Sequence, residues 1–461
     1  MWHWVKKDLP QHVNPENHLL PRGPAVDAKT PLDMFLAHFS HEAFELLTLE
    51  SNRYMQQLGR TRVNLISVQE MKILVGICFY MSIVILPNRR MYWSAKTRQP
   101  IVADAITVNR FEEILSVLHA NDNELIKQKG EPGYDRLHKV RPLLDILHIS
   151  FQSCAEPELF VSVDEQIIPF KGRHSLKVYM MKKPKKWGYK VWAQAGQSGY
   201  VHRFQFAGDN TVRNLDEDIS KAIGKSGEIN IQLTEGLNDN SYGFFYNYFA
   251  SPELLIELHK RKLHATCTIR ANRTRKCPLM CIKDIKKKGR GAYDYRQSKD
   301  DSVLICEWYD NKVVLVASNI HGVEPAYEVR RYDGKEKKHI NVQCPGLIKS
   351  YNRNMGGVDK CDMLLALYRN EQKSRKWYKR IMFHMLDLCV VNSWLLYRVV
   401  IPDCQLPLAG FKLELARALI LHRPADEEYV APVHGAKFQS ARGVNLNARY
   451  DLVDHFPLRT K

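Results

Sequence analysis

The chain has 461 residues, 45% hydrophobic and 26% charged, which is enough for a large core and two or three domains. Lys and Arg number 68 against 50 Asp and Glu, so the formal net charge of +18 favours a polyanionic partner, nucleic acid before an anionic membrane. Ten Cys residues without a dense framework argue against a disulfide-built secreted protein, and the N-terminus MWHWVKKDLP lacks the apolar segment of a signal peptide.

Residues 1–30 contain several Pro, Asn and Gly residues and no sustained hydrophobic period, which predicts an extended arm. From residue 31 to 158 the hydrophobic spacing is helical. The most apolar stretch, residues 73–87, follows Ser67-Val-Gln-Glu70, a capping-box pattern that marks a helix start. Because this stretch is shorter than the roughly 20 residues that cross a bilayer, we predict a buried helix rather than a membrane span.

The stretch ELFVSVDEQIIPFKGR carries a candidate site residue. Its β-branched and aromatic residues from Phe160 to Val163 predict a buried strand that ends at Asp164. A strand that delivers a carboxylate at its end can hold a divalent ion in a phosphoryl-transfer site. Taken alone, however, an Asp at a strand end is more often a turn former.

Strand and helix signals continue beyond this stretch. Residues 189–206 contain two alternating runs around a turn, which predicts a β-hairpin, whereas residues 208–240 are polar and ambiguous. Ser251 followed by Pro252 marks a helix start, and residues 264–270 predict another strand. Together these elements predict an α/β sheet with mixed strand directions.

The last third of the chain changes character twice. Residues 271–345 combine Arg- and Lys-rich runs with strand-like runs, which predicts a strand-rich basic insertion. A helical pattern then returns, and a long amphipathic helix is predicted after Lys376. Asp387, Asn392 and Arg398 within that helix argue against a membrane span.

Five blocks occur in a fixed order: SVDEQIIPFKGR, KPKKWGYK, FFYNYFAS, HATCTIRANR and YNRNMGGVDKCDML. With them the chain, from about Pro31 to Val400, resembles the piggyBac transposable element-derived proteins, which are domesticated relatives of the piggyBac DDE/D transposase. The resemblance implies a mixed α+β fold. An RNase H-like α/β domain would carry the basic insertion, flanked by a discontinuous all-helical domain for dimerisation and DNA binding.

The expected boundaries are an extended arm at 1–30, the two parts of the helical domain at 31–158 and 369–440, the two parts of the RNase H-like domain at 159–270 and 346–368, the insertion at 271–345, and a tail at 441–461.

The family reaction is cut-and-paste DNA transposition, in which three Asp residues hold two Mg²⁺ ions. Asp164 matches the first of these, and Asp359 the third, with Asp362 one helical turn further on. The second position is Tyr246, and a phenol, with an ordinary pKa of about 10, stays neutral at pH 7 and coordinates Mg²⁺ poorly. We therefore predict vestigial acids, with at most a weak Mg²⁺ site at Asp164 and Asp359.

DNA contacts are predicted at basic and aromatic positions, because such groups neutralise phosphates or stack on bases. The candidates are Lys182, Lys183, Lys185, Lys186, Arg270, Arg273, Arg275 and Trp377. The run KKPKK is also a candidate nuclear import signal.

No zinc module is predicted. Cys404 is the single cysteine after Val400, and the Cys277–Cys281 pair has no second pair of cysteines to complete a four-ligand site. The sequence thus predicts a nuclear protein that binds DNA and has lost transposase cleavage. A homodimer is compatible with this prediction. One alternative is an active metal-dependent transposase or nuclease that uses a replacement acid, of which Asp239 is the nearest. The other is a protein-interaction adaptor with residual DNA binding.

Overall fold

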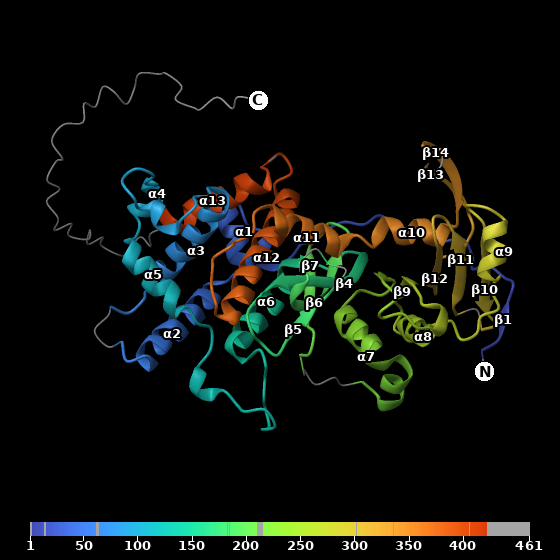
Figure 1. Cartoon of the computed structure of the whole chain (residues 1–461), viewed down its shortest axis with the longest axis horizontal. Coiled ribbons are helices and arrows are strands. Elements are labelled where there is room, and N and C mark those ends of the chain that lie inside the picture. The colour runs from blue at the N-terminus through green and yellow to red at the C-terminus, as the bar shows by residue number, and fades with distance from the viewer. Residues whose placement is uncertain are drawn as a thin grey trace, which may run out of the picture. The chain divides into compact units, whose positions relative to one another are not determined.

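The α-helices α1 to α6 are the main regular elements of the chain up to residue 154 (Figure 1). They are α1 (Pro31–His38), α2 (His41–Gln57), α3 (Val68–Ile83), α4 (Pro100–Ala103), α5 (Val108–Val117) and α6 (Arg141–Cys154). The computed structural model describes residues 2–12, 15–60, 64–181, 183, 185–209, 215–300, 302–334, 336–404 and 406–421.

The predicted capping box at the start of α3 is confirmed. The Ser67 side chain accepts a hydrogen bond from the Glu70 backbone, and the Glu70 side chain accepts one from the Ser67 backbone. The helix is buried, as predicted: α13 (Leu408–Leu421) lies against it, and a Cβ at Gly76 would come within 2.9 Å of the Ala416 carbonyl oxygen. Over the described residues, no helix has both the length and the apolar character to cross a membrane.

The late helices pack against the early ones. The longest, α12 (Trp377–Val400), packs against α1, and α13 packs against both α1 and α3. Helices that precede most of the sheet strands in sequence and helices that follow them therefore share one hydrophobic core. Asn392 of α12 ties this core to the sheet, because its side chain exchanges hydrogen bonds of 3.0 and 2.9 Å with the backbone of Val201.

A ten-stranded sheet forms the rest of the framework. Along the path its strands are β1 (Trp4–Val5), β10 (Tyr293–Ser298), β11 (Leu304–Tyr309), β12 (Val313–Ser318), β9 (His264–Thr268), β8 (Tyr242–Phe245), β4 (Phe160–Pro169), β6 (Trp187–Gly196) and β5 (Lys177–Tyr179), with β7 (Val201–Phe206) paired to β6. The pairs β4–β8 and β8–β9 are parallel and the other pairs are antiparallel, which confirms the predicted mixed directions and the β6–β7 hairpin.

The predicted end of the first strand at Asp164 is wrong. Strand β4 continues to Pro169, because β6 pairs with it all the way from Val161 to Pro169. Only the parallel pairing with β8 stops earlier, at Val163 opposite Phe245. Asp164 therefore lies inside a strand, at the point where β4 loses its neighbour on one side.

The strands of the predicted insertion are continuous with the main sheet. Three of them, β10 to β12, join it through the antiparallel pairing of β12 with β9. A second hairpin, β13 (Tyr327–Asp333) and β14 (Lys338–Cys344), stands outside this sheet, and α9 (Ile282–Lys287) precedes β10.

The N-terminal arm is hydrogen-bonded to the framework along its length. Strand β1 pairs with β10, and β2 (Leu20–Pro21) pairs with β3 (Ala155–Glu156). Between them, the Asp8 carboxylate accepts hydrogen bonds of 2.9 and 3.0 Å from the backbone N–H groups of Val323 and Glu324.

Four further helices complete the described chain: α7 (Glu217–Thr234), α8 (Pro252–Lys260), α10 (Gly346–Asn354) and α11 (Gly357–Leu367). Helix α7 lies in the polar segment whose structure the sequence left ambiguous, and its backbone breaks at Gly224 with a φ of 66°. Helix α8 begins as predicted, because the Ser251 side chain accepts a hydrogen bond from the Leu254 backbone.

Candidate functional site

Helix α11 brings two acidic residues over strand β4. Its first residue, Gly357, sits so close to the sheet that a Cβ there would come within 2.3 Å of the Gly196 carbonyl oxygen. The next residue, Val358, donates its backbone N–H to Ser162 Oγ at 3.2 Å. This close packing fixes Asp359 and Asp362, one helical turn apart, on the β4 side that carries Asp164.

Burial and the negative charge of Asp359 raise the pKa of both Asp164 and Asp362. Burial raises the pKa of Asp164 to about 6, and the negative charge of Asp359 adds to the shift. Burial likewise raises the pKa of Asp362 to about 7, against the opposing charge of Lys183. The carboxylates of Asp359 and Asp362 form no hydrogen bond or ion pair with any residue that the structure describes.

The donor set does not match a two-metal site. Within the described ranges, no group of three or more His, Cys, Asp or Glu side chains could hold a metal ion. Lys183 stands near the acids instead, because its positive charge lowers the pKa of both Asp164 and Asp362.

Tyr246 follows the last residue of β8, next to the β4 position of Asp164. Its hydroxyl donates a hydrogen bond of 2.9 Å to Glu165 Oε2. Glu165 follows Asp164 in β4, and the negative charges of both carboxylates contribute to the raised pKa of Tyr246. The Tyr246 ring also makes an edge contact with Phe249, with ring centroids 5.4 Å apart.

Glu165 has two further cationic partners. Lys190 Nζ lies 2.5 Å and Lys183 Nζ 3.6 Å from its carboxylate oxygens. Burial alone would raise the pKa of Glu165, but the hydrogen bond and charge of Lys190 outweigh it and hold the pKa below its usual value. Burial and the negative charge of Glu165 raise the pKa of Tyr246 well above its usual value, so the phenol stays protonated.

The basic loop before β6 is only partly visible, since the predicted contact Lys182 lies outside the described residues. Lys185 and Lys186 are exposed, and Lys183 faces the acids. The neighbouring residue Trp187 is 47% exposed, and Lys177 Nζ lies 4.7 Å from the centroid of its ring. This loop therefore presents cations and an aromatic surface together.

The three predicted arginines after β9 are engaged by the protein. Arg273 Nη1 donates to the carbonyl oxygens of Tyr248 and Ala250 at 2.9 and 3.0 Å, so it supports the loop that follows Tyr246. Arg275 pairs with Glu253 at 2.6 Å, and Arg270 donates to the Asn247 side chain at 3.1 Å. Of the three, Arg270 and Arg275 stay exposed to solvent.

Trp377 is the first residue of α12. Its ring stacks on His174 with centroids 3.9 Å apart and planes 18° from parallel. One ring face is thus occupied by a residue that the sequence did not single out. His174 carries no positive charge at neutral pH, because burial lowers its pKa to about 4.

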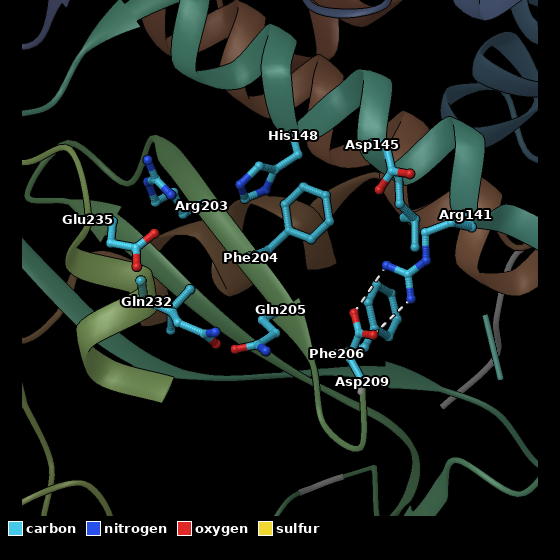
Figure 2. Close-up of a pocket in the computed structure, with 12 residues that line it drawn as sticks. Arg141, Asp145, His148, Arg203, Phe204, Gln205, Phe206, Asp209, Gln232 and Glu235 are labelled. Carbon is cyan, nitrogen blue, oxygen red and sulfur yellow. Dashed lines mark hydrogen bonds and ion pairs between the residues drawn. The ribbon is translucent and has the colours of Figure 1, made fainter. Parts of the chain in front are cut away.

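A separate pocket of about 210 Å³ lies between α6, β7 and the end of α7 (Figure 2). On one side Arg141 pairs with Asp209 at 2.8 Å, as the dashed lines show, and on the other Arg203 and Glu235 face each other. His148 between them is neutral, since burial lowers its pKa to about 4. None of the predicted site residues lines this pocket.

Comparison with known proteins identifies the family. A family model described as Transposase IS4 matches residues 30–394. Two human proteins, PiggyBac transposable element-derived protein 2 and protein 3, are 31% and 33% identical to this chain, each over 93% of it and 70% of the relative.

A solved structure of the piggyBac transposase synaptic complex with hairpin DNA superposes with a TM-score of 0.70 at 16% identity, covering 87% of this chain and 82% of that chain. This likeness confirms the predicted fold class, an RNase H-like sheet within a mixed α+β protein. The chain belongs to the family of piggyBac transposases and their transposable element-derived relatives.

Proposed function

We propose that this protein binds DNA but has lost metal-dependent DNA cleavage. The observation that carries the proposal is the hydrogen bond from Tyr246 to Glu165, which commits the residue at the second acidic position of the family to a neutral, half-buried role. Two-metal catalysis must neutralise charge on the attacking and leaving oxygens at once. With two of the three family carboxylates, one metal lacks its ligands.

Lys183 supports this proposal. Its ammonium group already offsets part of the negative charge of Asp164 and Asp362, which lessens their attraction for a divalent ion.

DNA binding rests on the formal net charge of +18 and on the exposed loop of Lys185, Lys186 and Trp187. Such groups bind phosphates with little sequence preference. The solved structure to which this chain is similar is a transposase synaptic complex with hairpin DNA, which supports duplex DNA as the partner. We extend the proposal to a nuclear location and a homodimer, to be tested by imaging of the tagged chain and by light scattering.

Cleavage is tested on a supercoiled plasmid with Mg²⁺ or Mn²⁺. The wild type should not nick above background, and Tyr246→Asp should recover weak nicking that Asp164→Asn removes again. Tyr246→Asn is the matched control, because it has the same size as the Asp variant without the charge. Robust nicking by the wild type that Asp164→Asn abolishes would overturn the proposal and favour an enzyme with a replacement acid.

A further inference from the structure

A second concave site lies in the helical part of the chain, where no predicted site residue lines it. It has a volume of about 530 Å³ and is bounded by the end of α2, the end of α5 and the segment leading into α12. Its basic lining residues are Arg60, Arg89, Lys373, Arg375, Lys376 and Lys379. These cations come from three parts of the chain that are far apart in sequence, so only the fold gathers them.

The positive charge of this pocket is not balanced by the protein. Its one acidic lining residue, Glu112, is already held by Arg90 through two hydrogen bonds of 3.1 and 2.7 Å. In the part of the chain that the structure describes, none of the six basic residues forms an ion pair. Six basic residues thus surround one cavity against a single carboxylate, whose charge acts on Arg90 and Arg89. The excess positive charges repel one another, and an anion in the cavity would lessen that repulsion.

Lys379 is the most deeply buried of the six basic residues and is only 4% exposed. Its ammonium group donates to the carbonyl oxygens of Leu115 and Ser116 at the end of α5. Burial, together with the positive charges of Lys376 and Arg89, lowers the pKa of Lys379 to about 7. The carbonyl dipoles at the C-terminal end of α5 thus hold the ammonium in place, and they supply only a partial negative charge.

Neutral groups also hold the surrounding cations. Lys376 Nζ donates to the Ser116 carbonyl at 3.0 Å and lies 4.7 Å from the centre of the Tyr54 ring. Arg60 donates to the Ser116 side chain at 3.1 Å, and Arg89 to the Gln372 side chain at 2.9 Å. The cations are therefore oriented around the cavity before any ligand arrives, which lowers the entropy cost of binding.

From this arrangement we propose that the pocket between α2, α5 and residues 372–379 binds a multiply charged phosphate ligand. Arginine forks match the oxygens of a phosphate group, and lysines supply further point charges. A volume of about 530 Å³ accommodates more than one phosphate group. The same chemistry is offered by a free polyphosphate and by consecutive phosphates of a DNA backbone.

Calorimetric titration of the whole chain with inorganic tripolyphosphate tests the site without DNA. We expect saturable binding that Arg375→Gln with Lys376→Gln weakens at least tenfold. The matched control, Lys286→Gln with Lys288→Gln, removes the same charge from exposed positions at the end of α9 and should change the affinity less than twofold. If the first pair fails to fold, Lys373→Gln with Arg375→Gln replaces it, because both side chains are exposed.

Two further titrations identify the source of the phosphate. If duplex DNA displaces tripolyphosphate and the pocket variant weakens both ligands, the site binds the DNA backbone. If DNA binds equally well with tripolyphosphate present and to the pocket variant, the ligand is a free polyphosphate. Absence of saturable tripolyphosphate binding, or equal weakening by the pocket and control variants, would overturn the inference. DNA binding by the other basic residues is scored separately and can fail or succeed by itself.

Discussion

The hydroxyl of Tyr246, directly after β8, donates a 2.9 Å hydrogen bond to the carboxylate of Glu165 in the middle of β4. This contact gives the tyrosine a structural role at the position where the resemblance to the family predicts a metal-binding acid. Glu165 in turn is held by Lys190, which also lies 3.8 Å from the centre of the Trp192 ring.

Removing this hydroxyl should lower stability modestly. In Tyr246→Phe, Glu165 keeps Lys190 and Lys183 but loses one charge-assisted hydrogen bond, which costs about 1–2 kcal/mol in the free energy of unfolding. Urea denaturation measures the change. Tyr248→Phe is the control, since no hydrogen bond from the Tyr248 hydroxyl to a described residue is found and the loss there should be smaller. Equal losses in both variants would remove the structural role of the Tyr246–Glu165 contact.

Restoring the carboxylate should restore metal affinity. Tyr246→Asp places a third acid next to Asp164, while Lys190 continues to neutralise Glu165. We expect Mn²⁺ affinity, followed by paramagnetic relaxation of water, to rise at least tenfold over the wild type. Tyr246→Asn should stay at the wild-type value. Tight Mn²⁺ binding by the wild type would show instead that the existing acids suffice.

The exposed lysines before β6 should contribute to DNA affinity without contributing to sequence choice. Lys185→Ala with Lys186→Ala should weaken binding of unrelated duplexes about equally and reduce the salt slope by about 2, one unit for each lost phosphate contact. Fluorescence anisotropy at several salt concentrations measures both quantities. Lys96→Ala with Lys127→Ala removes the same charge from other exposed positions and should leave the slope nearly unchanged. A loss confined to one sequence would point to base recognition.

The buried Lys379 should make stability depend on pH. Its pKa is lowered to about 7 in the folded chain, against 10.5 for the ordinary side chain, so between these values the unfolded chain binds the extra proton. Stability of the wild type should therefore rise with pH relative to Lys379→Met, by up to about 1.4 kcal/mol per unit above pH 7.

Urea unfolding of both proteins at pH 6, 7, 8 and 9 measures this difference. The exposed variant Lys286→Met is the control and should differ from the wild type by a constant amount. If the difference for Lys379→Met is also constant with pH, folding does not lower the pKa of Lys379. Tripolyphosphate should flatten the dependence, because a bound anion keeps the lysine protonated.

The sequence by itself determined the local features. The capping box of α3, the Ser251 cap of α8 and the β6–β7 hairpin follow from side chains a few residues apart, and each occurs where it was predicted. The ordered motifs likewise revealed the family and the tyrosine at position 246.

Only the tertiary structure decided how these features meet. Strand β4 runs past Asp164 because its second half pairs with β6, whose paired residues lie 19 to 27 positions further along the sequence. Trp377 stacks on His174, and Lys379 lies against the end of α5, through contacts that span about 200 residues or more. Such contacts depend on which surfaces pack together to bury the core. Hydrophobic burial is non-directional, so no fixed spacing in the sequence predicts which distant segments will meet. The short-range hydrogen bonds of caps and turns do have such a spacing, and for this reason they could be predicted.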